Sequence, residues 1–211
     1  MSSFVPEWMR RAVAAEALGL ADSYTVRRNF TMAATGFTPR RMGNVTRSLI
    51  AQKGFWIPQI YQSDAVRRIV ELVAGEPVSW CPYQPEQYVI TRLERGGDTH
   101  GWHWDDYRFA LVWVAECPDQ CDGGYVECVP ATFWNKCDPG VHRILASREV
   151  HRLAVGAGEV YLMRADSTMH RVHPIRAGRR TIVNMAFAGR DELCRTTSHE
   201  TMDALWSIPE M

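Results

Sequence analysis

The sequence predicts an α+β protein whose main body is an antiparallel double-sheet barrel or jelly roll, with N-terminal helices packed on it. Helical patterns fall in the first third of the chain. From Pro77 onward the segments are short, rich in β-branched and aromatic residues, and separated by Gly, Pro or Asp. Immunoglobulin-like sandwiches also have short strands, but helices at the start of the chain argue against one.

Two helices are predicted before residue 77. The first covers residues 6–20, because Pro6 lies near its start and Gly19 close to its end. The second begins at Ser63 or Asp64 and ends at Gly75. Its apolar stripe has helical spacing and consists of Val66, Ile69, Val70 and Val73.

About eight strands follow, and a short C-terminal helix in HETMDALWSI closes one end. The segments with strand character are QYVITRLER, FALVWVAE, GGYVECVP, VHRLAV, EVYLMRA and RRTIVNMAFAG. Since no repeat or flexible linker interrupts the chain, we expect one domain over 1–211. It comprises a helical part at about 1–76, a jelly-roll core at about 77–190 and a closing segment at 191–211.

Composition excludes several classes of protein. The formal net charge is zero, so no global field favours nucleic acid or an anionic membrane, and neither is expected as a partner. The sequence contains no run of 18 apolar residues, and its first residues lack the layout of a signal peptide. We therefore expect a cytoplasmic protein, and a homodimer is left open.

Six cysteines do not indicate disulfides in such a protein, and reduced thiols are the better interpretation. Four of them invite comparison with a zinc knuckle: Cys117, Cys121, Cys128 and Cys137. Their spacings fit no regular zinc pattern, and Cys128 falls in a strand-like segment, so a structural zinc is disfavoured.

A metal site is indicated by the stretch THGWHWDDYR, residues 99–108. His103 and Asp105 are two positions apart, so on an extended chain both side chains face the same way and can reach one ion. His-x-Asp alone is common by chance, and a further ligand is needed from another strand. His170, after GEVYLMRADSTM, provides it. Two histidines and one carboxylate form the facial triad of non-haem iron(II) oxygenases, with positions open for co-substrate and O2.

Arg180 stands ten residues after His170, at the start of the apolar segment TIVNMAFA. A guanidinium is costly to bury unpaired, and its planar fork suits a carboxylate. This arrangement suits 2-oxoglutarate, whose keto acid end chelates iron while an arginine holds the distal carboxylate.

His103-x-Asp105, His170 and HPIRAGRR ending in Arg180 together resemble the core of the Fe(II)/2-oxoglutarate-dependent dioxygenases, over about residues 86–189. The resemblance implies a double-stranded β-helix, in agreement with the strand pattern. HGWHWDDYRFALVWVAECP, GGYVECVP and GEVYLMRADSTMHRVHP are similar, more narrowly, to a small branch that hydroxylates or chlorinates free lysine-type amino acids. Its halogenases have glycine where Asp105 stands, so the aspartate implies a hydroxylase.

The same resemblance implies the residues around the substrate. Glu86 and Asp106 would cradle the side-chain ammonium, beside His100. Arg40 or Arg41 would take the amino acid carboxylate. Further contacts are expected from Asn184 and Trp206, and Tyr88 or Thr91 would help to bind the co-substrate.

The resulting prediction is Fe(II)- and 2-oxoglutarate-dependent hydroxylation of an unactivated C–H bond of a free cationic amino acid, lysine- or ornithine-like, with O2 consumed and succinate and CO2 as co-products. Alternatives are a carrier-tethered or peptide substrate, a halogenase-related activity, and a cupin-like metal protein without oxygenase activity in which His100 or His173 is a ligand. Trp104 and Trp113 are expected in the core, whereas His142, His151 and His199 are expected on the surface.

Overall fold

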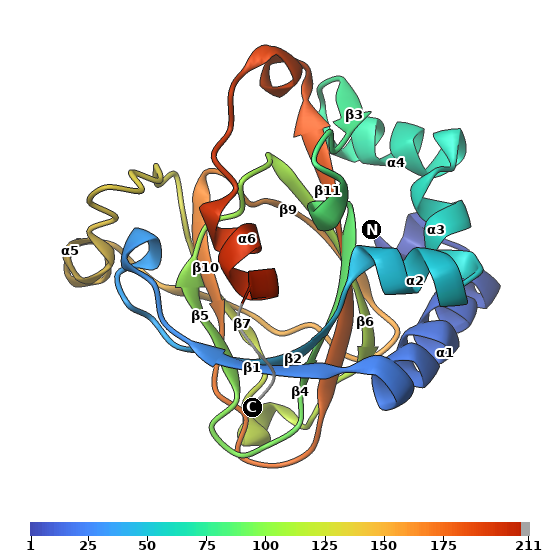
Figure 1. Cartoon of the computed structure of the whole chain (residues 1–211), viewed down its shortest axis with the longest axis horizontal. Helices are drawn as coiled ribbons and strands as arrows, with labels where there is room; N and C mark the ends of the chain where they lie inside the picture. The colour runs from blue at the N-terminus through green and yellow to red at the C-terminus, as the bar shows by residue number, and fades with distance from the viewer. Residues whose placement is uncertain (208–211) are drawn as a thin grey trace.

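The strands of the chain curl into an open barrel, as a computed structural model describing residues 1–207 shows (Figure 1). All eleven strands belong to one sheet with antiparallel pairings. They are β1 (Val26–Phe30), β2 (Arg40–Val45), β3 (Val78–Trp80), β4 (Tyr88–Leu93), β5 (Thr99–His103), β6 (Phe109–Glu116), β7 (Val126–Pro130), β8 (His151–Leu153), β9 (Val160–Arg164), β10 (Thr168–Val172) and β11 (Arg180–Gly189).

The barrel has two walls, and β2 bridges them. One wall has the order β8-β7-β10-β5, and the other has β4-β11-β6-β9 with β3 beside β11. Arg40 and Arg41 pair with β5, whereas Gly43, Asn44 and Val45 pair with β4. The whole of β1 pairs with β2.

The prediction of a purely helical segment over 1–76 is therefore wrong for β1 and β2. Their sequences, VRRNF and RRMGNV, lack the apolar alternation that marks a strand with one buried face. Arg28, Arg40 and Asn44 are nevertheless buried, because these strands turn polar side chains toward the inside of the molecule. The periodicity rule looks for apolar residues at such positions and misses them.

Within residues 1–207, six α-helices accompany the barrel: α1 (Glu7–Tyr24), α2 (Arg47–Lys53), α3 (Trp56–Tyr61), α4 (Asp64–Ala74), α5 (Val141–Ser147) and α6 (Glu200–Ser207). The predicted helix at 63–75 is confirmed, with Gly75 in the left-handed conformation at its end. Helix α1 runs four residues past the predicted end and includes Gly19. The short helices α2 and α3 were not expected from the sequence.

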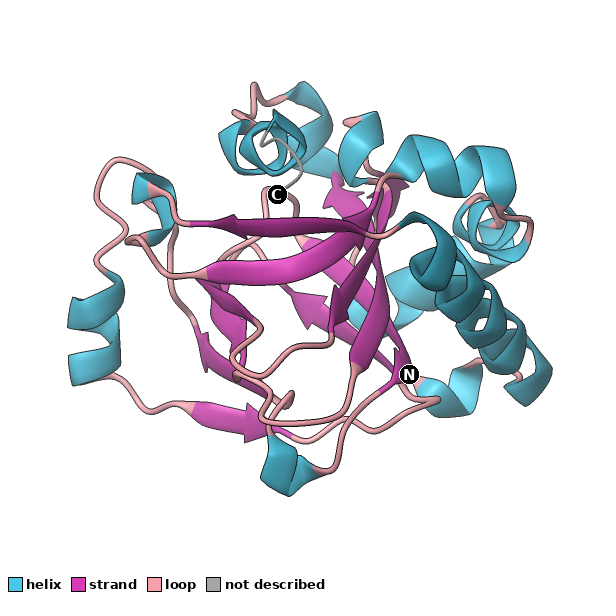
Figure 2. Ribbon diagram, turned by 60° about the horizontal axis from the view of Figure 1, so that its bottom comes forward, coloured by secondary structure: helices cyan, strands magenta, loops and turns pink. Residues whose placement is uncertain are grey.

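Helices α1 to α4 cover the outer face of the β4-β11-β6 wall (Figures 1 and 2). The main core fills this layer with the buried side chains of Val13, Ile50, Tyr61, Tyr88, Leu111, Trp113 and Phe187. Glu16 of α1 fixes the start of α3, because its carboxylate accepts hydrogen bonds from the amides of Phe55, Trp56 and Ile57 at 2.7–2.8 Å.

The opposite wall has a smaller core. Trp102, Trp104 and Met169 are buried there, and the Trp104 indole donates to Thr132 Oγ1 at 2.9 Å. Trp104 and Trp113 thus pack as expected, although Trp104 also contributes to the wall of the central cavity.

The C-terminal segment crosses the barrel mouth, where α6 lies over the opening (Figure 1). Leu205 is buried with Met42 and Leu93, so the helix is packed onto the barrel rim. The predicted C-terminal helix is thereby confirmed as far as Ser207, and residues 208–211 of the closing segment lie outside the described chain. Within residues 1–207, no helix has the length and apolar character that a membrane span requires.

Candidate metal centre and substrate cavity

The three predicted metal ligands converge. His103 ends β5, His170 lies in β10, and the two residues are directly paired across these strands. Asp105 follows β5, and its Oδ1 lies 3.5 Å from His103 Nε2 and 3.7 Å from His170 Nε2. One donor atom from each side chain lies within 4.8 Å of the others, the only such group of three or more in residues 1–207. Two nitrogens and one carboxylate are a donor set that fits Fe(II).

Both imidazoles are oriented by the backbone. His103 Nδ1 lies 2.6 Å from the Gly101 carbonyl oxygen, and His170 Nδ1 lies 2.8 Å from that of Thr168. Since a carbonyl only accepts, each Nδ1 carries the proton and each Nε2 keeps its lone pair toward Asp105. Burial lowers the pKa of His103 well below its usual value, which keeps this ring neutral and able to bind a cation.

The triad lines a cavity inside the barrel, and the space in this cavity that the centre of a water molecule can occupy is about 110 Å³. Most of the predicted site residues face it. Those lining it are Arg40, Glu86, Thr91, His100, His103, Asp105, Asp106, His170, Arg180 and Asn184.

Arg180 fits the predicted role of anion anchor. It begins β11, is 2% exposed, and its Nε and Nη2 have no hydrogen-bond partner. A buried guanidinium with unpaired donors facing a cavity is a site for a carboxylate group. The cavity therefore holds both a donor set that could bind a metal ion and a buried guanidinium that could receive a carboxylate.

The acidic side of the cavity contains Glu86 and Asp106. Glu86 is 6% exposed and its Oε2 has no partner. Burial raises the pKa of Glu86 well above its usual value, and the neighbouring Asp106 and Asp105 carboxyls raise it further. Burial also raises the pKa of Asp106, against the opposing effect of Lys136. Asp106 is paired: Lys136 Nζ donates to its Oδ1 at 2.6 Å and Thr201 Oγ1 to its Oδ2 at 3.1 Å.

The choice between Arg40 and Arg41 is decided by strand alternation. Arg40 is 4% exposed and faces the cavity, whereas Arg41 points outward and is exposed. Burial lowers the pKa of Arg40 to about 10, which leaves it charged at neutral pH. Its Nη1 donates to Thr35 Oγ1 at 2.8 Å. The expectation for Arg41 is therefore wrong.

Two other expectations are also wrong. Tyr88 lies one residue out of phase with Val89 and Thr91, so it packs against Tyr61 in the core behind the wall and does not reach the cavity. Trp206 packs against the buried cluster of Met42, Leu93, Ile175 and Leu205, while Met202 and Leu205 face the cavity from α6.

Histidines outside the triad have distinct positions. The ring of His100 stacks on His103 at 3.7 Å between centroids. His173 stacks on Tyr125, and its Nδ1 lies 3.1 Å from Glu127, so it is not a ligand of this metal centre. His142 and His151 are exposed as expected. The expectation of a solvated His199 is wrong, because it is half-buried, stacked on Tyr83 and 2.9 Å from Tyr107 Oη.

Sequence reasoning missed two residues above all: Tyr161, which lines the cavity, and Lys136, which pairs with Asp106. Tyr161 alternates with Met163 on β9, and both face the cavity near Arg180. The alternating pattern of EVYLMRA was a usable signal for Tyr161. Lys136 stands in an irregular loop, where no local pattern connects it with Asp106. The cysteines are all free, and no zinc-like cluster forms among them within residues 1–207.

Comparisons with known proteins bear on both fold and family. The chain matches the model of the family described as Halogenase D over residues 1–207. No curated protein matches it. Among solved structures it is similar to the non-heme alpha ketoglutarate dependent epimerase SnoN from nogalamycin biosynthesis, with 16% identity, 88% of this chain and 75% of that chain covered, and a TM-score of 0.61.

Two further structures have the same fold. AviO1 from Streptomyces viridochromogenes Tue57 is 18% identical, with 88% of this chain and 86% of that chain covered and a TM-score of 0.61. A prolyl-4-hydroxylase from Pseudomonas putida is 16% identical, with 89% of each chain covered and a TM-score of 0.52. A second SnoN structure contains Fe3+, alpha ketoglutarate and nogalamycin RO.

The jelly-roll fold is thus confirmed. The iron and alpha ketoglutarate of the second SnoN structure agree with the cofactors expected for this chain, and His103, Asp105 and His170 form a donor set that could hold the metal ion. Identities this low establish a shared fold, while the family match spans nearly the whole chain. The chain belongs to the Halogenase D family.

Proposed function

We propose that the protein hydroxylates an unactivated C–H bond of a free cationic amino acid, lysine- or ornithine-like, with Fe(II), 2-oxoglutarate and O2. The observation that carries the proposal is the Asp105 carboxylate, which lies 3.5 Å from His103 Nε2 and 3.7 Å from His170 Nε2. It supplies the third protein ligand. A halide would need that position free, so hydroxylation is favoured over chlorination.

The chain's own residues bind and orient the reactants. His103, Asp105 and His170 would hold iron, and Arg180 would hold the distal carboxylate of 2-oxoglutarate. When bound, iron and 2-oxoglutarate supply the oxidising power for attack on an unactivated C–H bond, with succinate and CO2 as co-products. The protein fixes which C–H bond lies nearest the metal and keeps bulk water out of the barrel.

A cationic amino acid is supported by the charges of the cavity. Glu86 offers an unpaired buried oxygen to an ammonium, and Arg40 offers a buried guanidinium to an α-carboxylate. Burying charged groups without a counter-charge is costly, and a ligand with both charges would satisfy Glu86 and Arg40 together. Asn184 and Thr91 line the same cavity and are proposed as further polar contacts.

The test combines purified protein with Fe(II), 2-oxoglutarate, O2 and each basic amino acid, and measures succinate together with a mass gain of one oxygen. The matched controls are Asp105→Ala and norleucine, which lacks the side-chain ammonium. If no basic amino acid raises 2-oxoglutarate turnover above the rate without substrate, the proposed substrate is wrong. Carrier-bound and peptide substrates, tested in parallel, would reveal a tethered substrate instead.

Halogenation is the second candidate, because the matching family model is described as a halogenase. The same assay with chloride present decides between them. A chlorinated product would show that Asp105 does not exclude a halide, and would overturn the use made of this residue.

A further inference from the structure

Lys136 closes the acidic side of the cavity from outside. Its Nζ donates to Asp106 Oδ1 at 2.6 Å, to the Ser198 carbonyl oxygen, and lies 3.5 Å from Glu200 Oε2. The ammonium also lies 4.4 Å from the ring centroid of Trp134. Two of its N–H donors thus have acceptors, and the ammonium is also ion-paired with Glu200, the first residue of α6, just after Ser198.

This pairing gives each carboxylate oxygen of Asp106 a donor within the chain. Oδ1 accepts from Lys136 and Oδ2 from Thr201, and the Asp106 side chain is 2% exposed. Glu86 stands next to it, 6% exposed, with an Oε2 that has no partner. Two acidic residues line the cavity here, but one already has its cation within the chain.

We propose that Lys136 is the built-in counter-ion of Asp106 and a positioning residue of the substrate site, so that Glu86 is the carboxyl group that receives the substrate ammonium. The inference rests on the proposed function, and it reduces the acidic residues that bind the substrate ammonium from two, Glu86 and Asp106, to Glu86 alone. Displacing Lys136 would break a partly buried ion pair together with its contact to Ser198, which is costlier than using the unpaired oxygen of Glu86.

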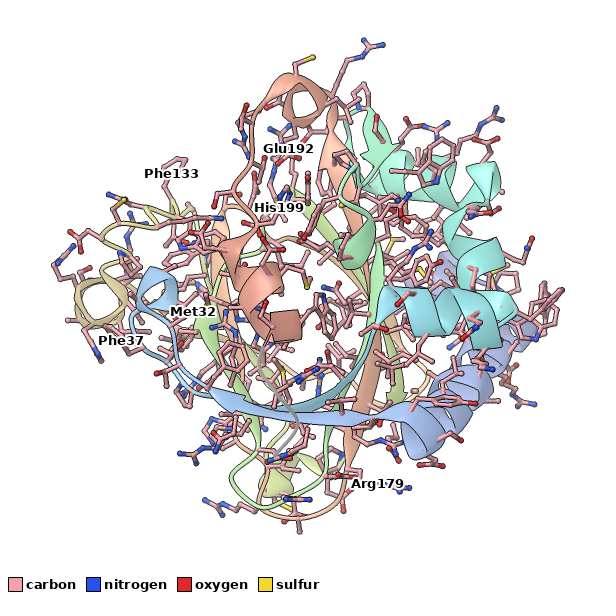
Figure 3. All side chains as sticks on the ribbon, in the orientation of Figure 1. Met32, Phe37, Phe133, Arg179, Glu192 and His199 are labelled. Atoms are coloured by element: carbon pink, nitrogen blue, oxygen red, sulfur yellow. The ribbon has the colours of Figure 1, made fainter. Side chains whose placement is uncertain are left out.

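The arrangement also links the substrate site to the C-terminal segment. Two tyrosine hydroxyls contact this segment: that of Tyr107 lies beside His199, and that of Tyr83 donates to Asp203. Figure 3 shows His199 on the segment entering α6, and Phe133 standing out from the Lys136 loop into solvent, where it is 87% exposed. Lys136 therefore holds Asp106 and the covering segment in one fixed geometry.

The test measures binding of L-lysine, L-ornithine and norleucine to protein loaded with Mn(II) and 2-oxoglutarate. Glu86→Gln is expected to weaken binding of both basic amino acids at least about tenfold and to leave norleucine unchanged. Adding Lys136→Met to Glu86→Gln frees Asp106, so binding of the basic amino acids is expected to recover by at least about threefold. Lys53→Met, at the other, exposed lysine, is the matched control and should change nothing.

If Lys136 had only a structural role, the double variant would bind the basic amino acids no better than Glu86→Gln does. That result, or a Glu86→Gln protein within about threefold of wild type, overturns the proposal. Titration with 2-oxoglutarate checks that each variant keeps its cavity. Lys136→Gln replaces Lys136→Met if the latter does not fold.

A substrate-independent measurement separates this inference from the proposed function. Lys136→Met leaves Asp106 unpaired and should lower the urea midpoint, and Asp106→Asn in the same chain should recover it. If wild type binds no basic amino acid, the assignment of the ammonium to Glu86 fails with the proposed substrate. The Lys136–Asp106 pairing is then supported if Asp106→Asn restores the urea midpoint of Lys136→Met. It is overturned if the single and the double variant have equally lowered midpoints.

Discussion

Replacing Arg180 by Met tests the co-substrate site through two effects of opposite sign. Arg180 is 2% exposed, and its Nε and Nη2 lack partners. A buried donor without a partner costs about 1–3 kcal/mol. Methionine fills a similar space without any donor. The free energy of unfolding of ligand-free Arg180→Met is therefore expected to match or exceed that of wild type, by up to about 3 kcal/mol.

Binding of 2-oxoglutarate should change in the other direction. Removing one partner of a buried, hydrogen-bonded charge pair costs about 2–5 kcal/mol, which corresponds to a Kd about 30-fold to several thousand-fold higher. Stability is measured by urea unfolding without ligand, and affinity by calorimetric titration of the Mn(II)-loaded protein. Arg180→Lys is the control that keeps a charge but loses the planar fork.

Two results would refute this reasoning. A Kd within about threefold of wild type would show that the distal carboxylate of 2-oxoglutarate lies elsewhere. A ligand-free variant less stable than wild type by more than about 1 kcal/mol would show that the guanidinium has a structural role, and that its unpaired donors are not a poised receptor.

Three further predictions concern other parts of the molecule. Asp105→Gly removes the proposed third metal ligand. Loss of a hydrogen-bond partner of a ligand already lowers metal affinity about 10–100-fold, so Fe(II) should bind to this variant at least about tenfold more weakly. Competition with a chelator measures the affinity, and hydroxylated product should disappear. Glu86 has a pKa raised above the 4.5 of an ordinary glutamate, so its stabilising contribution is present below pH 4.5 and is lost as pH rises toward the raised pKa. The melting temperature of substrate-free Glu86→Gln should therefore exceed that of wild type at pH 7, and the difference should vanish near pH 4. The same difference at both pH values would contradict this prediction. Glu16→Ala removes the acceptor for three amides of α3 and should cost about 1–2 kcal/mol in urea unfolding, whereas Glu7→Ala, at an exposed position of α1, should cost less than about 0.5 kcal/mol.

The convergence of His103, Asp105 and His170 was predictable from sequence because its signals are local and specific. His103 and Asp105 share a face by spacing alone, and a second histidine after a later strand is the natural third ligand. Arg180 was predictable for a physical reason as well, since a guanidinium at the start of an apolar strand needs a partner. The fold class followed from short strands and turn residues.

The sequence could not reveal features that depend on distant parts of the chain. Lys136 lies 30 residues from Asp106, and only the closed barrel brings them together. Strands β1 and β2 escaped prediction because the inside of this barrel is polar, so Arg40 and Asn44 occupy positions where apolar residues were sought. The error on Tyr88 was avoidable: in β4, counting by two from Thr91 places Tyr88 on the other face.

The position of β2 has a consequence for how the chain can be divided. A fragment beginning at residue 77 would contain the metal ligands and Arg180, and it looks like a self-contained catalytic core. It would lack the strand that spans β4 and β5, so two rows of backbone amides and carbonyls in the barrel wall would lose their partners. Exposed edges of this kind recruit strands from other molecules. Such a fragment is expected to aggregate when expressed alone, and to regain solubility when residues 1–76 are supplied as a separate polypeptide.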